Sequence, residues 1–260
     1  MKSLCTRIWR VYEAVAMCLG LGALAVVCLT WLPFAMVLNP LLPQRLAQRI
    51  GRYAIFTGLR IYLLFLRVFC ACRFDFGELD RLRDGGPVVV VANHPSLLDA
   101  VLILSRLPNA VCVMKASILD NILFGAAARM ARYIRNDAPF KMIRDARKEL
   151  ADGAQLVIFP EGSRTRLFPL DRCMPTAGLI AGRAKVPVQA LLIEFSTPYL
   201  GKAWPLARPP SLPLSCRIRF GRRFSPPTDV SAFTAELEAH LRAELGATEA
   251  AEPAPQPASA

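Results

Sequence analysis

The stretch VVVVANHPSLLDAV, residues 88–101, sets an unbroken apolar run directly against Asn93, His94 and Pro95. The run from Pro87 to Ala92 has the length and the β-branched content of a strand buried on both faces, as in a parallel sheet. Proline suits the first turn of a helix, so residues 95–107 are predicted to form a helix directly after this strand. A buried strand followed at once by a helix is the repeating unit of α/β folds.

The same alternation extends outward over residues 86–245. It predicts further strands near residues 110–114, 154–160, 186–195 and 214–221, and helices over 118–134, 138–152, 176–185 and 231–245. Strands that alternate with helices indicate an α/β fold with a largely parallel sheet flanked by helices. The tail, residues 246–260, is rich in Ala and Pro, and we expect it to be disordered.

The N-terminal segment differs in composition, because no residue from Ala14 to Gln44 carries a charge. A signal peptide has an apolar core of only about 7–15 residues, so this longer stretch is predicted to be a membrane anchor. As one straight helix it would extend about 46 Å, against a hydrocarbon core of about 30 Å. Pro33 lies inside it, which favours a kinked or re-entrant path. Basic residues flank both ends, which favours a monotopic hairpin over a single crossing.

Residues 54–73 are apolar with Arg60, Arg67 and Arg73 interspersed. We interpret this segment as an interfacial helix whose arginines reach lipid headgroups, the alternative being a core helix of the globular domain. The chain then divides into an N-terminal membrane anchor (1–53), an interfacial helix with a connector (54–85), a globular domain (86–245) and the tail (246–260).

The charge balance favours an anionic partner, because 32 Lys and Arg residues against 20 Asp and Glu give a net charge of +12. Arg129, Arg132 and Arg135 recur every three residues, which predicts one basic helical face, either solvated or docked on anionic lipid. Aromatic residues do not interleave with this cluster, so nucleic acid is not an expected partner. The eight cysteines show neither a CxxC pair nor zinc-ligand spacing. We therefore expect reduced, mostly buried thiols and no metal site.

His94 is one of only two histidines in the chain, and Asp99 follows it five positions later. Ligands of α/β proteins gather at the carboxyl ends of the strands, where both His94 and Glu161 are predicted to lie. Asp99 can bond one ring nitrogen of His94 and leave the other to take a proton from a substrate hydroxyl. On these two residues alone, a structural or capping role is the favoured reading.

Other motifs accompany this pair. NHPSLLD (93–99) is followed by FPEGSRTR (159–166) and then by KVPVQALLI (185–193), while residues 113–137 carry an intermediate lysine, glycine and arginine. Together these blocks, over roughly residues 73–225, resemble the glycerolipid acyltransferase family, whose namesake is 1-acyl-glycerol-3-phosphate acyltransferase. The chain departs from the family pattern at Ala190, where a proline is usual, and in the segment before Gly178, which lacks a common Phe-Lys pair.

The resemblance implies a role for each matching residue. His94 would be the general base and Asp99 its orienting partner, with direct attack of the acceptor hydroxyl on an acyl thioester. The substrate-binding residues would come from the EGSR loop and from two intermediate basic positions: Glu161, Gly162, Ser163, Arg164, Lys115 and Arg135. Arg164 would grip the phosphate of the acceptor. The alternative for Lys115 and Arg135 is a plain surface charge, and the alternative for Arg164 is that it pairs with a carboxylate and so shapes the loop after Pro160.

The resemblance thus implies transfer of a fatty acyl group from acyl-CoA or acyl-carrier protein to 1-acyl-glycerol-3-phosphate, which forms phosphatidic acid. No cofactor is expected, because the acyl donor is itself a substrate. The expected partners are membrane lipids, the donor and lysophosphatidic acid or a related lysolipid. Other acceptors, such as a lyso-aminolipid or a glycolipid, stay open, as do a thioesterase and a catalytically silent lipid-binding protein. The expected location is the bacterial inner membrane, with the catalytic domain on the cytoplasmic face.

Overall fold

A computed structural model describes residues 2–205 and 207–251 of the chain. Its centre is one seven-stranded sheet in the order β1-β7-β6-β2-β5-β3-β4. Every neighbouring pair is parallel except β6 and β7, which are antiparallel. The strands are β1 (Cys72–Asp75), β2 (Val88–Ala92), β3 (Ala110–Met114), β4 (Ile134–Arg135), β5 (Gln155–Ile158), β6 (Val188–Phe195) and β7 (Leu214–Phe224). The predicted α/β fold with a largely parallel sheet is confirmed.

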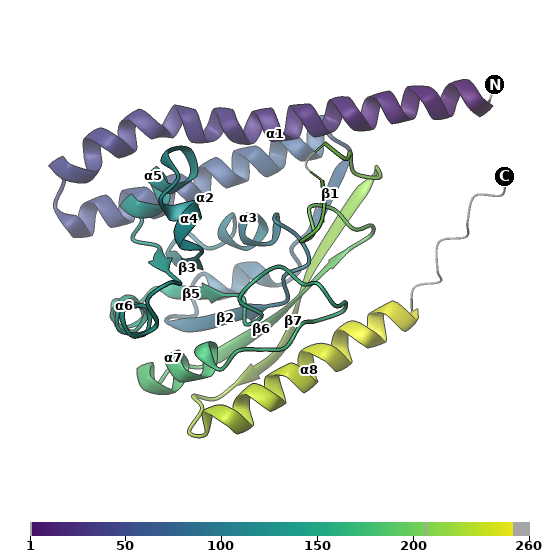
Figure 1. The fold of residues 1–260 in the computed structure, drawn as a ribbon. Coiled ribbons are helices and arrows are strands. Elements are labelled where there is room, and N and C mark those ends of the chain that lie inside the picture. The colour runs from purple at the N-terminus through teal and green to yellow at the C-terminus, as the bar shows by residue number, and fades with distance from the viewer. Residues whose placement is uncertain (1, 206, 252–260) are drawn as a thin grey trace.

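Helices cover both faces of this sheet (Figure 1). One face carries α1 (Lys2–Leu41), α2 (Gln44–Phe69), α3 (Asp99–Leu104), α4 (Ala116–Leu119) and α5 (Ile122–Met130). The other carries α6 (Pro139–Ala151), α7 (Thr176–Ala184) and α8 (Val230–Ala251), and a short 3-10 turn, η1 (Leu79–Leu82), precedes β2. The layers leave β2 in the middle of the molecule, where each of its five residues is at most 1% exposed. Its continuous valine run is the signature of a strand covered on both faces.

The N-terminal segment forms a helical hairpin, in which α1 and α2 run side by side in opposite directions (Figure 1). α1 is continuous through Pro33 and Pro40, and the chain turns back at residues 42–43. One apolar stretch, Leu4–Leu41, is long enough to cross a membrane, and only 11% of its most apolar part is buried. A core helix of a soluble domain would be covered far more completely, so this surface indicates association with a membrane.

α2 combines the two readings that the sequence left open for residues 54–73. Arg60 and Arg67 are exposed, while Phe56, Tyr62 and Leu66 are buried against the rest of the molecule. The helix begins at Gln44, so the expected boundary between residues 53 and 54 falls inside it, and the expected helix ends at Phe69 rather than at Arg73. Arg73 belongs to strand β1.

Three further expectations were wrong in detail. α3 begins at Asp99 rather than at Pro95, and α8 runs to Ala251, so residues 246–251 are helical. Residues 252–260 of the expected disordered tail lie outside the described residues. Arg129, Arg132 and Arg135 do not share a helical face, because α5 ends at Met130, Arg132 has a positive φ of 61°, and Arg135 lies in β4.

Candidate active site

The carboxyl ends of β2, β5 and β6 meet at one edge of the sheet, and Asn93 is the first residue beyond β2 there. The side-chain amide of Asn93 donates to the carbonyl of Ile193 at 2.9 Å and accepts from the N–H of Ile193 at 2.8 Å. This amide continues the pairing with β6 for one more residue after the β2 backbone has turned away. The start of the following loop, and with it His94, is therefore fixed in position.

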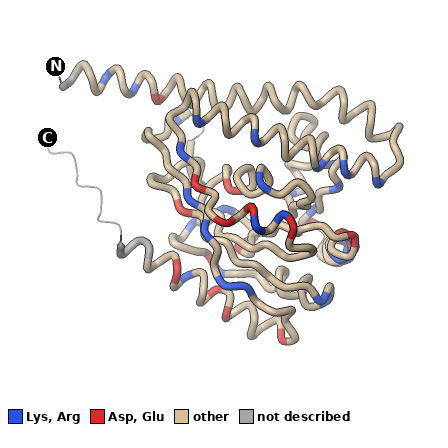
Figure 2. The backbone as a smooth tube through the Cα atoms, turned by 180° about the vertical axis from the view of Figure 1, so that it is seen from behind, with Lys and Arg blue, Asp and Glu red and all other residues tan. Residues whose placement is uncertain are grey.

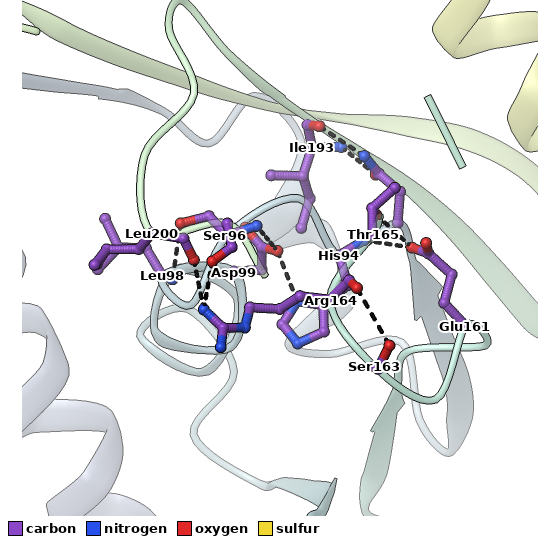
Figure 3. A network of polar contacts seen from close by, with 12 residues as sticks. His94, Ser96, Leu98, Asp99, Glu161, Ser163, Arg164, Thr165, Ile193 and Leu200 are labelled. Carbon is purple, nitrogen blue, oxygen red and sulfur yellow. Dashed lines mark hydrogen bonds and ion pairs between the residues drawn. The ribbon is translucent and has the colours of Figure 1, made fainter. Parts of the chain in front are cut away.

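His94 and Asp99 are in contact, as the sequence predicted (Figure 3). Nδ1 of His94 lies 2.7 Å from Oδ2 of Asp99, and the imidazole stacks on the ring of Phe159 at a centroid distance of 3.9 Å. The His94 side chain is 16% exposed, whereas that of Asp99 is fully buried. No described residue bonds Nε2 of His94, so this nitrogen is the one left for a substrate proton. Such an arrangement fixes the ring orientation of a general base.

The turn between His94 and α3 aims the Asp99 carboxylate back at the ring. The N–H of Ser96 donates to Oδ2 of Asp99 at 2.8 Å, and the Ser96 hydroxyl accepts from the N–H of Leu98 at 3.2 Å. These bonds hold residues 95–98 in a turn, which is why the helix starts later than the proline suggested. Burial raises the pKa of Asp99 from 3.8 to about 6, although the bond to His94 opposes this shift. Oδ1 of Asp99 is buried without a hydrogen-bond partner among the described residues.

Both carboxylate oxygens of Glu161 accept hydrogen bonds from the protein itself. Its Oε1 accepts from the N–H of His94 at 2.8 Å and from the hydroxyl of Thr165 at 2.9 Å, while Oε2 accepts from the N–H of Asp171 at 2.9 Å. The residue is 8% exposed, and burial raises the pKa of its carboxyl group. The N–H of Thr165 also donates to the carbonyl of His94 at 2.8 Å. Glu161 therefore ties the backbone of His94 to Thr165 and Asp171 in the loop that follows β5.

The rest of the EGSR loop turns the chain past the histidine. Gly162 has a positive φ of 69°, which favours glycine, and a Cβ there would lie 3.0 Å from Sδ of Met174. The hydroxyl of Ser163 donates to the carbonyl of Arg164 at 3.2 Å (Figure 3). Nη1 of Arg164 donates to the carbonyls of Leu200 and Gly201, both at 2.8 Å.

Arg164 thus uses one guanidinium nitrogen to anchor the loop after β6, and its charge lowers the pKa of Asp99. The carboxylate partner proposed as an alternative for Arg164 is not seen among the described residues. Nη2 and Nε of Arg164 make no bond to the described residues and stay available for an anionic group.

Lys115 and Arg135 lie outside this network. Lys115 follows β3 with an exposed side chain. Arg135 ends β4 at the outer edge of the sheet, and its guanidinium is bound by the carboxylates of Asp120, at 2.5 and 3.2 Å, and Asp137, at 2.8 and 3.2 Å. These two carboxylates already balance the charge of Arg135 and take up most of its donors. The structure brings together His94, Asp99, Glu161, Gly162, Ser163 and Arg164, and among the described residues neither Lys115 nor Arg135 is hydrogen-bonded to any of them.

Sequence reasoning missed the residues that support this cluster: Asn93, Ser96, Phe159, Thr165 and Asp171. Asn93, Ser96 and Phe159 stand inside the quoted motifs, so their position was a usable signal. Nothing in the sequence marked Asp171, because the partners of its carboxylate are backbone N–H groups. Its carboxylate accepts from the N–H groups of Arg166 at 3.0 Å and Leu167 at 2.8 Å, and its own N–H donates to Glu161.

Comparison with known proteins agrees with this arrangement. The model of the family described as Acyltransferase matches residues 73–194. A lyso-ornithine lipid O-acyltransferase of Rhizobium meliloti (strain 1021) is 36% identical over 92 residues, which cover 34% of this chain and 30% of that protein. A lysophosphatidylcholine acyltransferase of Drosophila melanogaster is 30% identical over 126 residues, which cover 45% of this chain and 23% of that protein. The matched parts therefore span less than a third of either curated protein.

The fold is also that of a solved structure. The crystal structure of the 1-acyl-sn-glycerophosphate (LPA) acyltransferase PlsC from Thermotoga maritima superposes with a TM-score of 0.72 at 16% identity, and the match covers 93% of this chain and 98% of that one. Here the α/β domain places a His–Asp pair at the carboxyl edge of its sheet and is joined to an apolar helical hairpin. Residues 73–194 are thus similar in sequence to the Acyltransferase family, and the fold is shared with a solved lysolipid acyltransferase.

Proposed function

We propose that this chain transfers a fatty acyl group from acyl-CoA or acyl-carrier protein to the free hydroxyl of a lysolipid, with 1-acyl-glycerol-3-phosphate as the leading acceptor and phosphatidic acid as the product. The observation that carries the proposal is the His94–Asp99 pair, which lies at the edge where three central strands end. Nε2 of His94 makes no hydrogen bond to a described residue. The reaction needs no cofactor, because the thioester supplies the acyl group.

In this mechanism Nε2 of His94 removes the hydroxyl proton while the hydroxyl oxygen attacks the thioester carbonyl. Asp99 stabilises the imidazolium that forms. The tetrahedral intermediate then collapses, the carbon–sulfur bond breaks, and His94 returns the proton to the departing thiolate. The products are an ester and a free thiol, and His94 is again neutral.

Arg164 is the proposed contact for the acceptor phosphate. Its fixed guanidinium lies beside the reacting pair, and two of its nitrogens are open. Gly162 and Ser163 form the adjoining stretch of loop, and Lys115 is proposed as a more distant charge at the same sheet edge. We further propose that the reaction takes place at the cytoplasmic face of a bacterial inner membrane, where soluble acyl donors meet the lysolipid.

The proposal is tested with detergent-purified protein, labelled acyl-CoA or acyl-carrier protein, and a panel of lysolipids. We expect ester formation on lysophosphatidic acid, with a loss of 10²–10⁴-fold in His94→Ala, because a positioned base contributes about that much. Best turnover on a lyso-ornithine lipid or another lysolipid would move the assignment to that acceptor. Release of free fatty acid without ester would indicate a thioesterase, and lysolipid binding without turnover would indicate a silent binding protein.

A further inference from the structure

A cavity of about 1140 Å³ lies at the edge of the sheet opposite to His94. It is lined by the helical hairpin and by the residues that lead into β3 and β5, among them Asn109 and Asp152. The five residues of β2, about 17 Å at 3.3 Å per residue, separate this edge from the active site. The cavity is as large as many sites for small ligands, which are about 300–1,000 Å³. It is therefore a separate site and not an extension of the proposed acceptor pocket.

Its walls are apolar on one side and basic on the other. Val26 and Val27 of α1 face Ile50 and Ile61 of α2 across the groove. Val26 and Ile61 are also among the exposed apolar residues, at 61% and 58%, so the groove opens onto the apolar surface of the hairpin. This wall suits a hydrocarbon chain, and a small soluble anion would leave it unused.

The basic side of the cavity lies at the start of α2, where Figure 2 shows Lys and Arg residues gathered beside the turn from α1. Arg45 and Arg49 are one helical turn apart, line the cavity and are exposed. Within residues 2–205 and 207–251 neither has an ion-pair partner. Asp152 also lines the cavity, so the two guanidinium groups are accompanied by one further carboxylate.

Arg52, the third arginine of the cavity, is already neutralised. Nη2 of Arg52 is ion-paired with Glu149, both side chains are less than 10% exposed, and Nη1 donates to the side-chain oxygen of Asn109 at 2.8 Å. Gln48 donates to the Glu149 carboxylate at 2.6 and 2.8 Å. The charge of Arg52 is therefore balanced inside the protein, and the unbalanced positive charge of the cavity is that of the exposed Arg45 and Arg49.

We propose that this cavity binds one anionic phospholipid of the surrounding membrane, with the phosphate between Arg45 and Arg49 and an acyl chain along Val26, Val27 and Ile61. Arg45, Arg49 and Asp152 together carry a net charge of +1, which balances the single negative charge of a phosphodiester, and the apolar wall matches its chain. The lipid would sit where α2 leaves the hairpin turn and would hold that end of the helix against the membrane surface. The site does not depend on the proposed reaction, because no catalytic residue lines it.

The test uses the fluorescence of Trp31, which also lines the cavity. In full-length protein carrying Trp9→Phe and Trp204→Phe, Trp31 is the remaining tryptophan, and its quenching by lipids with brominated chains reports contact. We expect saturable quenching by brominated phosphatidylglycerol in detergent and at least ten-fold weaker binding of brominated phosphatidylcholine. Arg45→Gln with Arg49→Gln should remove the preference for the anionic lipid. Arg60→Gln, an exposed arginine of the same helix that does not line the cavity, should leave it intact.

Equal quenching by the two lipids, or an unchanged preference in the double variant, would overturn the proposal. Displacement of the brominated lipid by millimolar inorganic phosphate would also overturn it, because the site would then bind the free anion. As a second measurement, phosphatidylglycerol should raise the melting temperature of the wild-type protein and not that of the double variant. None of these readouts requires turnover, so they are independent of whether the proposed acyl transfer is correct.

Discussion

The charge of the buried Asp99 carboxylate stabilises a protonated His94, but it lowers the stability of the folded protein. A pKa displaced from 3.8 to about 6 corresponds to at most about 3 kcal/mol against the charged form. Below about pH 6 the carboxyl group becomes protonated and no longer stabilises an imidazolium. We therefore expect kcat/KM to fall as the pH is lowered through about 6, as measured in a pH–rate profile with saturating donor.

The raised pKa of Asp99 also determines whether the protein becomes more or less stable as the pH rises. Between about pH 4 and 6 the folded protein holds a proton on Asp99 that the unfolded chain has lost, so this group makes the protein less stable as the pH rises through that window. Asp99→Asn removes the charge, so it should melt no lower than wild type at pH 7.5 while losing 10²–10⁴-fold in kcat/KM. A variant that loses activity and stability together would contradict this account.

Glu161 is expected to act through the backbone of His94. Glu161→Gln would place an amide N–H against a backbone N–H group, which costs about 1–3 kcal/mol when buried. We expect a lower melting temperature and a kcat reduced by about ten-fold or more, with both KM values within a factor of two. Thr165→Val, which removes one of the three bonds, should show a smaller loss. A rise in acceptor KM alone, with unchanged melting, would instead place Glu161 against the substrate.

Arg164 is expected to act on the acceptor. Arg164→Lys keeps the charge and one carbonyl contact but loses the planar fork of donors. The apparent KM for the acceptor should rise about ten-fold, equal to about 1.4 kcal/mol, with the donor KM nearly unchanged. Arg166→Lys, an exposed neighbour in the same loop, is the matched control. Equal damage to both KM values with earlier melting would restrict Arg164 to anchoring Leu200 and Gly201.

The residues of the site were predictable to the extent that they stand in short motifs at strand ends. His94 and Asp99 are five positions apart, so the chain itself limits how far they can separate, and their contact followed from sequence. Arg135 did not follow, because its carboxylate partners Asp120 and Asp137 come from a turn that no periodicity marks. The burial of Glu161 was also hidden, since its partners are backbone N–H groups that every sequence contains.

At the scale of elements, α2 belongs both to the hairpin and to the domain. Arg52 and Gly51 are buried against the domain, and a Cβ on Gly51 would lie 2.7 Å from the nitrogen of Ala131. Deleting residues 1–42 should leave a cooperatively folding domain in detergent. Deleting residues 1–52 also removes Arg52 and leaves Glu149 buried without its cation, which should cost about 3–5 kcal/mol.

Chemical denaturation of the two truncated proteins measures this difference. In the full-length protein, Arg52→Ala should reproduce most of the loss caused by the longer deletion. Equal stability of the two truncations would mean that the start of α2 contributes nothing to the domain.

The predicted strands were found because each is a short apolar run between turn residues. β1 and β4 were missed for different reasons. β1 continues an apolar stretch that reads as helix, and only its pairing with β7 makes it a strand. β4 has two residues, Ile134 and Arg135, which is too short for any periodicity, and it exists through its pairing with β3. Both strands therefore depend on contacts distant in sequence.

At the scale of the whole molecule, one side of the protein is apolar and the rest is a charged α/β domain. α1 exposes large side chains along its length, such as Ile8, Val15 and Met36. We expect the full-length protein to stay in the membrane pellet after washing with alkaline carbonate. The protein without residues 1–42 should be partly released, because Tyr53, Ile61 and Leu64 of α2 stay exposed. Complete release of the full-length protein would contradict the assignment of the hairpin as a membrane anchor.

The pairing of β1 with β7 also sets an order of events during translation. β1 follows the hairpin directly, yet the strand that it pairs with begins only at Leu214. While the ribosome adds the intervening residues, the hairpin can already enter the lipid, but β1 and β6 both lack their shared neighbour. Unpaired strand edges are prone to join other chains. Synthesis of β7 is therefore the step that closes the nascent sheet and links β1, which follows the helical hairpin, to β6.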